Sequence, residues 1–201
     1  MAAVSDNVGT GDLDVTIDNL DLSVEEMEQR FIARYSELNF IRDQYLGTKI
    51  PGYSRSQANV IGGFNDLEDV GAAIEPTGSF FAVFMRIPPG GRVEPHNHPT
   101  LEVLMPVEGS LTVMWGLDGD NRDGRRRIEL GTLDTIAIPP GVFRTFHNQS
   151  DQDVVIHFTI GTDRPPTPIA VPEWVKREAR DAGWEIDETG VLRQAADNPT
   201  T

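Results

Sequence analysis

Short strand-like runs separated by turn signals fill the middle of this 201-residue chain. The first run, 80–87, is aromatic and β-branched and ends at Pro88-Pro89-Gly90-Gly91, which predicts a strand followed by a turn. Further strands are expected over 92–98, 101–107, 110–116, 126–130, 134–138, 144–148 and 154–160. Because turn signals recur every ~8–12 residues and no useful helical run intervenes, the pattern predicts an all-β sandwich or barrel over residues 79–162 and disfavours a parallel sheet.

The residues before the strands are expected to lie outside the barrel. Residues 1–22 are rich in Asp, Gly and Thr, which indicates a loose acidic arm. Residues 23–78 are expected to hold one helix and a connecting region, with 48–78 as loop and short strands. The helix begins at Ser23-Val24-Glu25-Glu26, a capping box in which the first and last residues can each bond the other's backbone N–H. It continues along one apolar stripe of Val24, Met27, Phe31, Tyr35 and Leu38, which predicts a helix over 24–39.

Residues 163–201 predict a strap followed by a helix. Four prolines between Asp163 and Pro172 favour an extended strap. Pro172 suits the first turn of a helix over 173–182, and Gly183 stands just past the end of that helix. We expect the last ten residues to be frayed.

Charge and composition exclude several classes of function. Seventeen basic and 32 acidic residues give a net charge of −15, so neither nucleic acid nor a membrane surface is an expected partner. The chain has no cysteine, which excludes disulfides, thiolate metal sites and cysteine nucleophiles. No apolar run approaches the ~18–20 residues of a membrane span, and the first residues lack the features of a secretory signal. We therefore expect a cytoplasmic protein.

Two histidines and a glutamate form the strongest chemical signal. His96 and His98 are two residues apart, so on a strand their imidazoles point to the same side. Glu102 follows a tight turn at Pro99-Thr100 and can bring a carboxylate to the same point. Two neutral imidazoles and one carboxylate suit a divalent first-row metal and leave positions open for substrate and O₂. The alternative is two exposed loop histidines beside an unrelated glutamate.

This part of the chain resembles the cupin superfamily over roughly residues 79–162. The first cupin motif is similar to Gly90-x5-His96-x-His98-x3-Glu102-x6-Gly109, and the second to Asp134, Pro139-x-Gly141 and Asn148. The resemblance implies a single antiparallel, jelly-roll-like β-barrel with a metal held by His96, His98 and Glu102. It also suggests a homodimer, which would cover edge strands and the apolar stripe of the N-terminal helix. The family includes dioxygenases, isomerases, lyases and non-catalytic binders.

One position departs from the family pattern. The second motif usually places a fourth ligand, a histidine, three residues after the glycine of Pro-x-Gly, and this chain has Arg144 there. A guanidinium stays protonated and has no lone pair to give, so Arg144 is not a ligand. Its charge would suit the carboxylate or enolate of a bound substrate. The alternatives are that Arg144 pairs with Glu102 or Asp134 in a site without metal, or that it turns outward to the rim.

Other charged residues give weaker signals. His157 is interpreted as a core or pocket-lining residue, with a fourth ligand or a general base as the alternative. His147 is expected to face outward. Glu94 shares the parity of the two ligand histidines, so one alternative is that it lines the mouth of the pocket, but it is interpreted as an exposed turn residue. Arg125-Arg126-Arg127 is interpreted as a solvated turn, because three arginines do not outweigh the overall acidity.

The leading hypothesis is a metal-dependent enzyme that acts on a small anionic organic substrate, and within that class a non-haem Fe(II) dioxygenase. Arg144 would neutralise the substrate, and His157 would shuttle a proton. The same three ligands would also serve Mn, Ni, Zn or Co in an isomerase or lyase. A hypothesis of another class is a non-catalytic cupin that binds a small acid as a sensor or storage module.

Overall fold

The computed structural model describes residues 22–62, 70–74, 80–117, 121–161, 170–188 and 190–195. The chain divides into two units, Met1–Phe31 and Ile32–Thr201. The first unit contributes the described helix α1 (Val24–Phe31), and the second contains two β-sheets, a small hairpin and the helix α2 (Glu173–Asp181). Within the described residues, no helix is long and apolar enough to cross a membrane.

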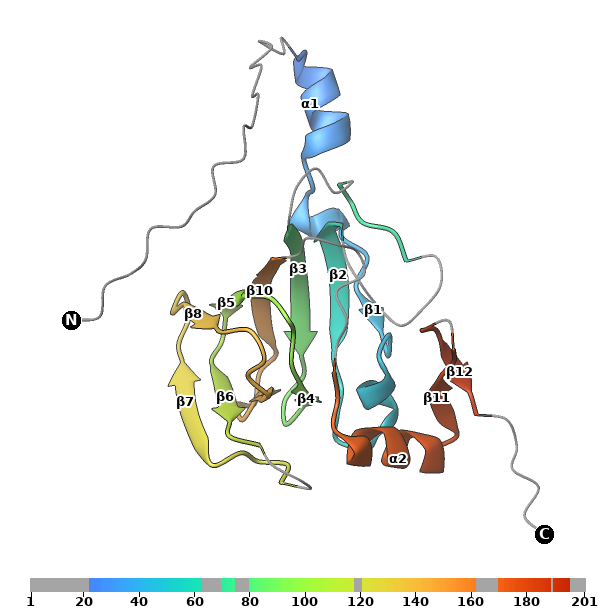
Figure 1. Ribbon diagram of the computed structural model, residues 1–201. Helices are drawn as coiled ribbons and strands as arrows, with labels where there is room; N and C mark the ends of the chain where they lie inside the picture. Colours follow the sequence, from blue (N-terminus) through green and yellow to red (C-terminus); the bar gives the residue numbers. More distant parts are fainter. Residues whose placement is uncertain are drawn as a thin grey trace, which may run out of the picture. The chain divides into compact units, whose positions relative to one another are not determined.

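Two antiparallel sheets enclose one core (Figure 1). The six-stranded sheet consists, in spatial order, of β1 (Ile41–Arg42), β2 (Ser56–Ile61), β3 (Phe80–Ile87), β10 (Val154–Gly161), β5 (Glu102–Glu108) and β8 (Ile136–Ile138). The four-stranded sheet consists of β4 (Arg92–His96), β9 (Arg144–His147), β6 (Leu111–Trp115) and β7 (Arg126–Leu130). All eight strands expected between residues 79 and 162 are present within two residues of their expected ends, so the predicted all-β antiparallel fold is confirmed.

Alternation along the strands decides which side chains fill the core. In β10 the inward positions are Val154, Ile156, Phe158 and Ile160, all at most 4% exposed. The positions between them at His157 and Thr159 are partly exposed. This two-residue period places hydrophobic residues of both sheets in one shared cluster, and burying them is the main force that holds the sheets together.

The six-stranded sheet begins earlier in the chain than the expected barrel. β2 pairs antiparallel with β3, so that Gln57 lies opposite Met85. Gln57 and Asn59 are polar and give no strong strand signal, yet both are buried, and Gln57 Nε2 donates to Asn59 Oδ1 over 3.1 Å. This hydrogen bond joins two buried polar side chains within β2, a pairing that periodicity alone does not reveal.

The N-terminal helix is shorter than predicted. The capping box is present, because the Glu26 N–H donates to Ser23 Oγ over 3.1 Å and the Ser23 N–H donates to Glu26 Oε2 over 2.9 Å. However, α1 ends at Phe31 rather than near residue 39. Within the second unit, Tyr35 starts the 3₁₀ turn η1 (Tyr35–Glu37), and its ring packs edge-on against Phe84 with centroids 5.0 Å apart. This aromatic contact with β3 takes the place of the predicted helical continuation. The homodimer stays a prediction.

The C-terminal residues build a second, smaller core. α2 agrees with the expected helix, and Gly183 follows it with a φ of +84°, a conformation that glycine adopts without steric cost. Trp174 of α2 is 1% exposed and packs in a cluster with Leu46, the first residue of the 3₁₀ turn η2 (Leu46–Lys49).

A hairpin after α2 belongs to the same cluster. β11 (Trp184–Ile186) pairs with β12 (Leu192–Gln194), and Leu192 is 4% exposed. The expected fraying therefore does not extend to residues 192–194. Residues 196–201 lie outside the described residues, as do 162–169, which contain most of the expected strap.

Asn148 links the end of β9 to two neighbouring segments. It is 0% exposed, and its Nδ2 donates to the carbonyl oxygens of Ile87 (2.9 Å) and Gln152 (2.7 Å). Its Oδ1 accepts from the Ser150 N–H over 3.0 Å. One side chain thus satisfies buried or partly buried backbone groups in three places.

Removing this amide should destabilise the fold. Asn148→Ala leaves buried backbone groups without hydrogen-bond partners, so we expect it to lower the free energy of unfolding by roughly 2–3 kcal/mol. Denaturant unfolding measures the change. The matched control is Asn39→Ala at an exposed position, which should shift stability by less than about 0.5 kcal/mol. Equal effects of the two substitutions would contradict the structural role of Asn148.

Candidate metal centre

Three residues predicted as metal ligands meet in the barrel interior. His96 ends β4, His98 follows two residues later, and Glu102 begins β5. Their ligand atoms all lie within 4.8 Å of one another, and the three residues are 7%, 2% and 3% exposed. We call these three residues the His–Glu cluster. The alternative of exposed loop histidines is therefore wrong.

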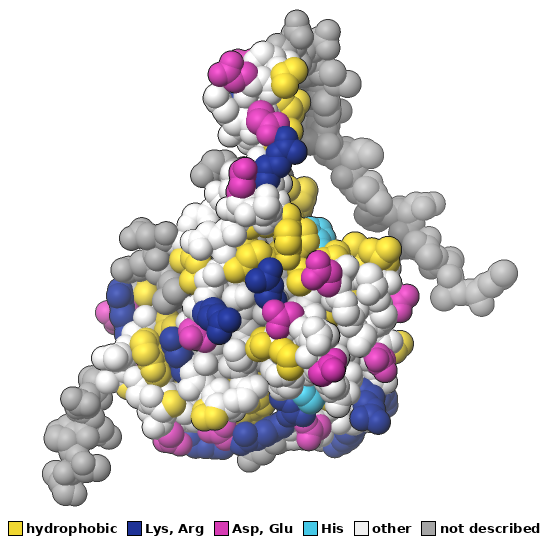
Figure 2. Space-filling model, turned by 180° about the vertical axis from the view of Figure 1, so that it is seen from behind, with side chains coloured by type: hydrophobic (Ala, Val, Ile, Leu, Met, Phe, Trp, Pro, Cys, Tyr) yellow, Lys and Arg dark blue, Asp and Glu magenta, His cyan; other side chains and the backbone are white. Residues whose placement is uncertain are grey.

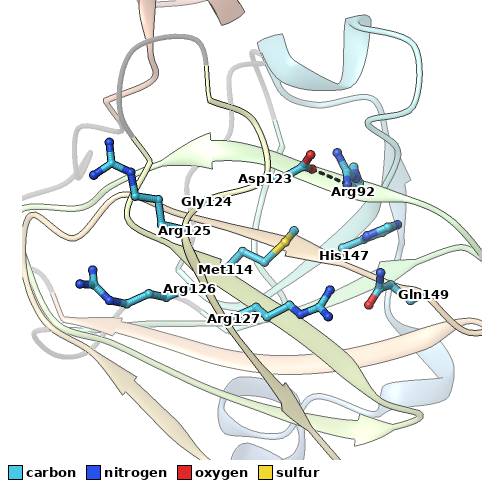
Figure 3. A pocket seen from close by; sticks show the side chains of 9 residues that line it. All are labelled: Arg92, Met114, Asp123, Gly124, Arg125, Arg126, Arg127, His147 and Gln149. Atoms are coloured by element: carbon cyan, nitrogen blue, oxygen red, sulfur yellow. Dashed lines mark hydrogen bonds and ion pairs between the residues drawn. The ribbon is translucent and has the colours of Figure 1, made fainter.

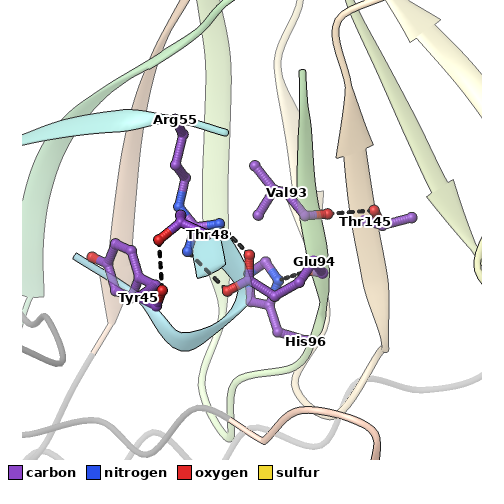
Figure 4. Close-up of polar contacts among 7 residues, drawn as sticks. All are labelled: Tyr45, Thr48, Arg55, Val93, Glu94, His96 and Thr145. Atoms are coloured by element: carbon purple, nitrogen blue, oxygen red, sulfur yellow. Dashed lines mark hydrogen bonds and ion pairs between the residues drawn. The ribbon is translucent and has the colours of Figure 1, made fainter. Parts of the chain in front are cut away.

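The backbone sets the tautomer of His96. Its Nδ1 lies 2.7 Å from the carbonyl oxygen of Glu94 (Figure 4). A carbonyl oxygen only accepts, so Nδ1 carries the proton and Nε2 keeps its lone pair. Metal-ligating histidines are commonly oriented by such a bond on the other ring nitrogen. His96 is thus held in a form that can donate to a metal.

Arg144 reaches the same cluster from β9. It is 1% exposed, its Nη1 donates to the His96 carbonyl oxygen over 3.2 Å, and its Nη2 is hydrogen-bonded to Glu102 Oε2. Asp134 instead accepts from the Gly131 N–H over 2.8 Å. Of the arrangements that the sequence leaves open, the structure has Arg144 turned inward and paired with Glu102.

A second buried ion pair lies beside the cluster. Arg55 binds Glu94 through both guanidinium Nη atoms, with Nη2 2.9 Å from Oε1, and the guanidinium lies 4.2 Å from the centroid of the Tyr45 ring (Figure 4). Glu94 is 3% exposed, so its interpretation as an exposed turn residue is wrong. Glu94 lines the same small cavity as His96 and His98, as the parity that it shares with them predicts. Arg55 carries no motif that would mark it in the sequence.

Burial gives the cluster its protonation states. Desolvation, reinforced by the positive charge of Arg144, lowers the pKa of His98 to about 3 and the pKa of His96 well below its ordinary value. Both imidazoles are therefore neutral near pH 7, which is the form that binds metal. Burial also raises the pKa of Glu102, although Arg144 opposes this shift by favouring the carboxylate.

Two cavities of different character involve Arg144, which lines one of them and bonds Glu102 in the lining of the other. The His–Glu cluster lines a space of about 20 Å³, which holds roughly one water or ion but no organic molecule. Arg144 itself lines a neighbouring cavity of about 250 Å³. Apart from Arg144, that cavity is lined by Val113, Trp115, Ile136, Ala137, Ile138, Pro139 and Val142. Through its bond to Glu102, the cation Arg144 links the small cavity to the larger apolar one.

The other two histidines of the chain lie away from the His–Glu cluster. His157 is on the outward-facing side of β10, where its ring lies 5.0 Å from that of Phe84, and the inward neighbour Phe158 lines the small cavity instead. The structure therefore does not bring His157 to the His–Glu cluster. His147 follows the inward Phe146 on β9 and faces out of the core, as the sequence predicts.

The donor set fits a divalent metal. Two neutral imidazoles and a carboxylate converge, and one imidazole has its lone pair set by a backbone bond. The two arginines and two glutamates of the interior sum to no net charge. A divalent cation would therefore add uncompensated positive charge, and an anionic ligand would restore the balance.

The fold and the cluster together define the class of protein: a two-sheet β-barrel with a buried His-x-His-x3-Glu set inside. Residues 83–160 match the family model described as "Cupin domain". This part of the chain is a cupin domain of the cupin superfamily. A search of curated protein sequences finds no match.

Solved structures resemble this chain at low sequence identity. A cupin-2 domain from Rhodospirillum rubrum is 14% identical with a TM-score of 0.51, over 71% of this chain and 80% of that chain. The polyketide cyclase from Streptomyces resistomycificus is 18% identical with a TM-score of 0.47, over 68% and 82% of the two chains. An oxalate oxidase is 19% identical with a TM-score of 0.45, and this chain spans only 56% of its length. Identities this low concern the fold alone.

The depressed pKa of His98 predicts acid sensitivity. Because the folded-state pKa lies below the ordinary 6.5, stability is complete above about pH 6.5 and is lost as pH falls towards 3. Between pH 7 and pH 5, we expect His98 alone to cost the metal-free protein up to about 2 kcal/mol of unfolding free energy. Urea unfolding at the two pH values measures this loss. His98→Gln should remove that share of the pH dependence, and an unchanged dependence would contradict the assignment.

Proposed function

We propose that this protein is a metal-dependent enzyme that acts on a small organic anion, and that it is a non-haem Fe(II) dioxygenase. One observation carries the proposal: Arg144 bonds the buried His–Glu cluster and also lines the adjoining apolar cavity. Metal ligands, an anion-binding group and space for a hydrocarbon body are thereby contiguous.

The metal would be held by His96, His98 and Glu102. A bound Fe(II) ion would supply redox chemistry and activation of O₂ and of substrate oxygens. Mn, Ni, Zn and Co accept the same ligands, and with them the reaction would be an isomerisation or a lyase reaction. The protein's own part is to keep both imidazoles neutral and to hold the three ligands together in the small cavity.

Arg144 would bind the anionic end of the substrate. Its guanidinium offers five N–H donors in a planar fork, and a carboxylate or enolate can accept two of them together. Such an anion would give Arg144 a further partner besides Glu102 and the His96 carbonyl oxygen, and it would offset the added charge of the metal. The apolar cavity of about 250 Å³ would receive the rest of the molecule. We therefore expect an anionic substrate with an apolar body.

A non-catalytic binder is the second candidate. The observation that favours it is the hydrogen bond between Arg144 and Glu102, because it already engages one carboxylate oxygen that a metal would use. In this function the cavity would hold a small acid against Arg144, and the protein would act as a sensor or storage module. Ligand-dependent thermal stabilisation without turnover would favour this candidate.

Metal retention tests the ligand assignment. After anaerobic loading with Fe(II) and removal of free ion, we expect the wild-type protein to retain metal stoichiometrically and His96→Ala to lose it, because two protein ligands hold a metal far more weakly than three. Metal analysis by mass spectrometry measures retention. His147→Ala, which removes a histidine that faces out of the core, should retain as much metal as the wild type. Failure of the wild type to retain metal would refute the enzyme proposal.

Substrate recognition tests the role of Arg144. O₂ consumption by the Fe(II)-loaded protein should be screened against diketones, catechols and 2-oxo acids. For an active compound, Arg144→Lys keeps the charge but loses the planar fork, so we expect KM to rise about tenfold to a hundredfold with the metal retained. An unchanged KM in this variant would contradict substrate binding by Arg144.

A further inference from the structure

A third cavity, of about 450 Å³, lies on the outer face of the four-stranded sheet (Figure 3). Arg92, Met114 and His147 of β4, β6 and β9 line it, and each stands next to an inward-facing core residue on its own strand. Since side chains alternate along a strand, this cavity and the His–Glu cluster lie on opposite faces of the sheet. It therefore belongs to neither of the cavities around Arg144.

The lining of this cavity is strongly basic. It consists of Arg92, Met114, Asp123, Gly124, Arg125, Arg126, Arg127, His147 and Gln149, which we call the basic pocket. Four arginines against one aspartate leave a formal charge of +3 with His147 neutral, in a chain whose net charge is −15. Figure 2 shows Lys and Arg side chains along the lower edge of one face, with acidic side chains between them. Positive charge is thus concentrated in this pocket, although the chain as a whole is acidic.

Neighbouring acids neutralise only part of this charge. Arg92 Nη2 bonds Asp123 Oδ1 over 2.7 Å. Among the residues that the structure describes, neither Arg126 nor Arg127 has a carboxylate partner. Figure 3 shows Arg127 extending towards Gln149 and His147, whereas Arg125 and Arg126 extend to the other side. All three arginines of the run are exposed, as the sequence predicts, but Arg126 and Arg127 begin strand β7 instead of lying in a turn.

The polar groups around Arg127 are suited to oxyanions. Gln149 Oε1 accepts from Thr112 Oγ1 over 2.9 Å, so the donor end of this amide is the one left for a ligand. Arginine forks bind phosphate and carboxylate groups with two parallel hydrogen bonds. Met114 adds an apolar contact at the base of the pocket.

We propose that the basic pocket binds a small polyanion that carries at least two oxyanion groups, either phosphates or carboxylates. A volume of about 450 Å³ is typical of a small-molecule site. Arg92 and Arg127 lie on different strands, so each can bind one oxyanion group of such a ligand. The group at Arg92 would displace Asp123 from its ion pair with this arginine. The site is independent of the metal and of the proposed reaction.

Calorimetric titration of the metal-free protein at low ionic strength tests the proposal. Inorganic pyrophosphate serves as the phosphate probe and citrate as the carboxylate probe, and the tighter binder identifies the source of the oxyanion. We expect saturable binding that Arg127→Gln weakens about tenfold to a hundredfold, because one charge-assisted bidentate contact is lost. Arg92→Gln provides a second, independent variant with the same expected direction.

Two controls separate this site from its alternatives. Arg42→Gln removes an exposed arginine of β1 that lies outside the pocket. If the probes bind in the pocket and are not held by general electrostatic attraction, their affinity for this variant should stay within about twofold of the wild type. Both probes chelate metals, so a trace of metal left in the His–Glu cluster could bind them. The titration is therefore repeated with His96→Ala, which should bind both probes as the wild type does. Absence of saturable binding of both probes would overturn the proposal. So would equal weakening by Arg42→Gln and Arg127→Gln, or loss of binding in His96→Ala.

Discussion

Two arginine–glutamate pairs buried in the barrel interior set the conditions for everything the site can do. Arg144 pairs with Glu102 and Arg55 with Glu94, and all four side chains are at most 5% exposed. Because an unpaired buried charge costs several kcal/mol, on the order of 3–5 when one partner is removed, each glutamate depends on its arginine. The backbone adapts to this requirement as well. A Cβ at Gly47 would lie 2.3 Å from Cδ of Glu94, so glycine leaves the space that this pair needs.

The two faces of the four-stranded sheet carry different chemistry because side chains alternate between them along each strand. On β9, Arg144 and Phe146 face the core, while His147 faces the basic pocket on the other side. The inner face is neutral overall and apolar around its charged pairs, which suits a metal and an organic anion. The outer face is open and basic, which suits oxyanions. A register slip of one residue would exchange the two sets of side chains, so the hydrophobic core that fixes the register also keeps the two sites apart.

Local patterns in the sequence predicted the strands and the ligand set well. Strand periodicity and the spacing of His96, His98 and Glu102 depend on residues close together in the chain, and both agree with the structure. Prediction failed where distant residues decide the outcome. Glu94 is buried because Arg55, 39 residues earlier, pairs with it, and Tyr35 leaves the helical stripe because Phe84 offers it an aromatic partner.

The sequence by itself determined the all-β pattern, the convergence of two imidazoles and a carboxylate, and the fact that Arg144 cannot be a metal ligand. These follow from strand geometry and from the chemistry of single side chains. Only the tertiary structure decided that Arg144 turns inward to Glu102, that His157 lies away from the cluster, and that the arginine run lines a pocket. Each of these depends on which strands become neighbours, and strand pairing joins residues too far apart in the chain for local patterns to record.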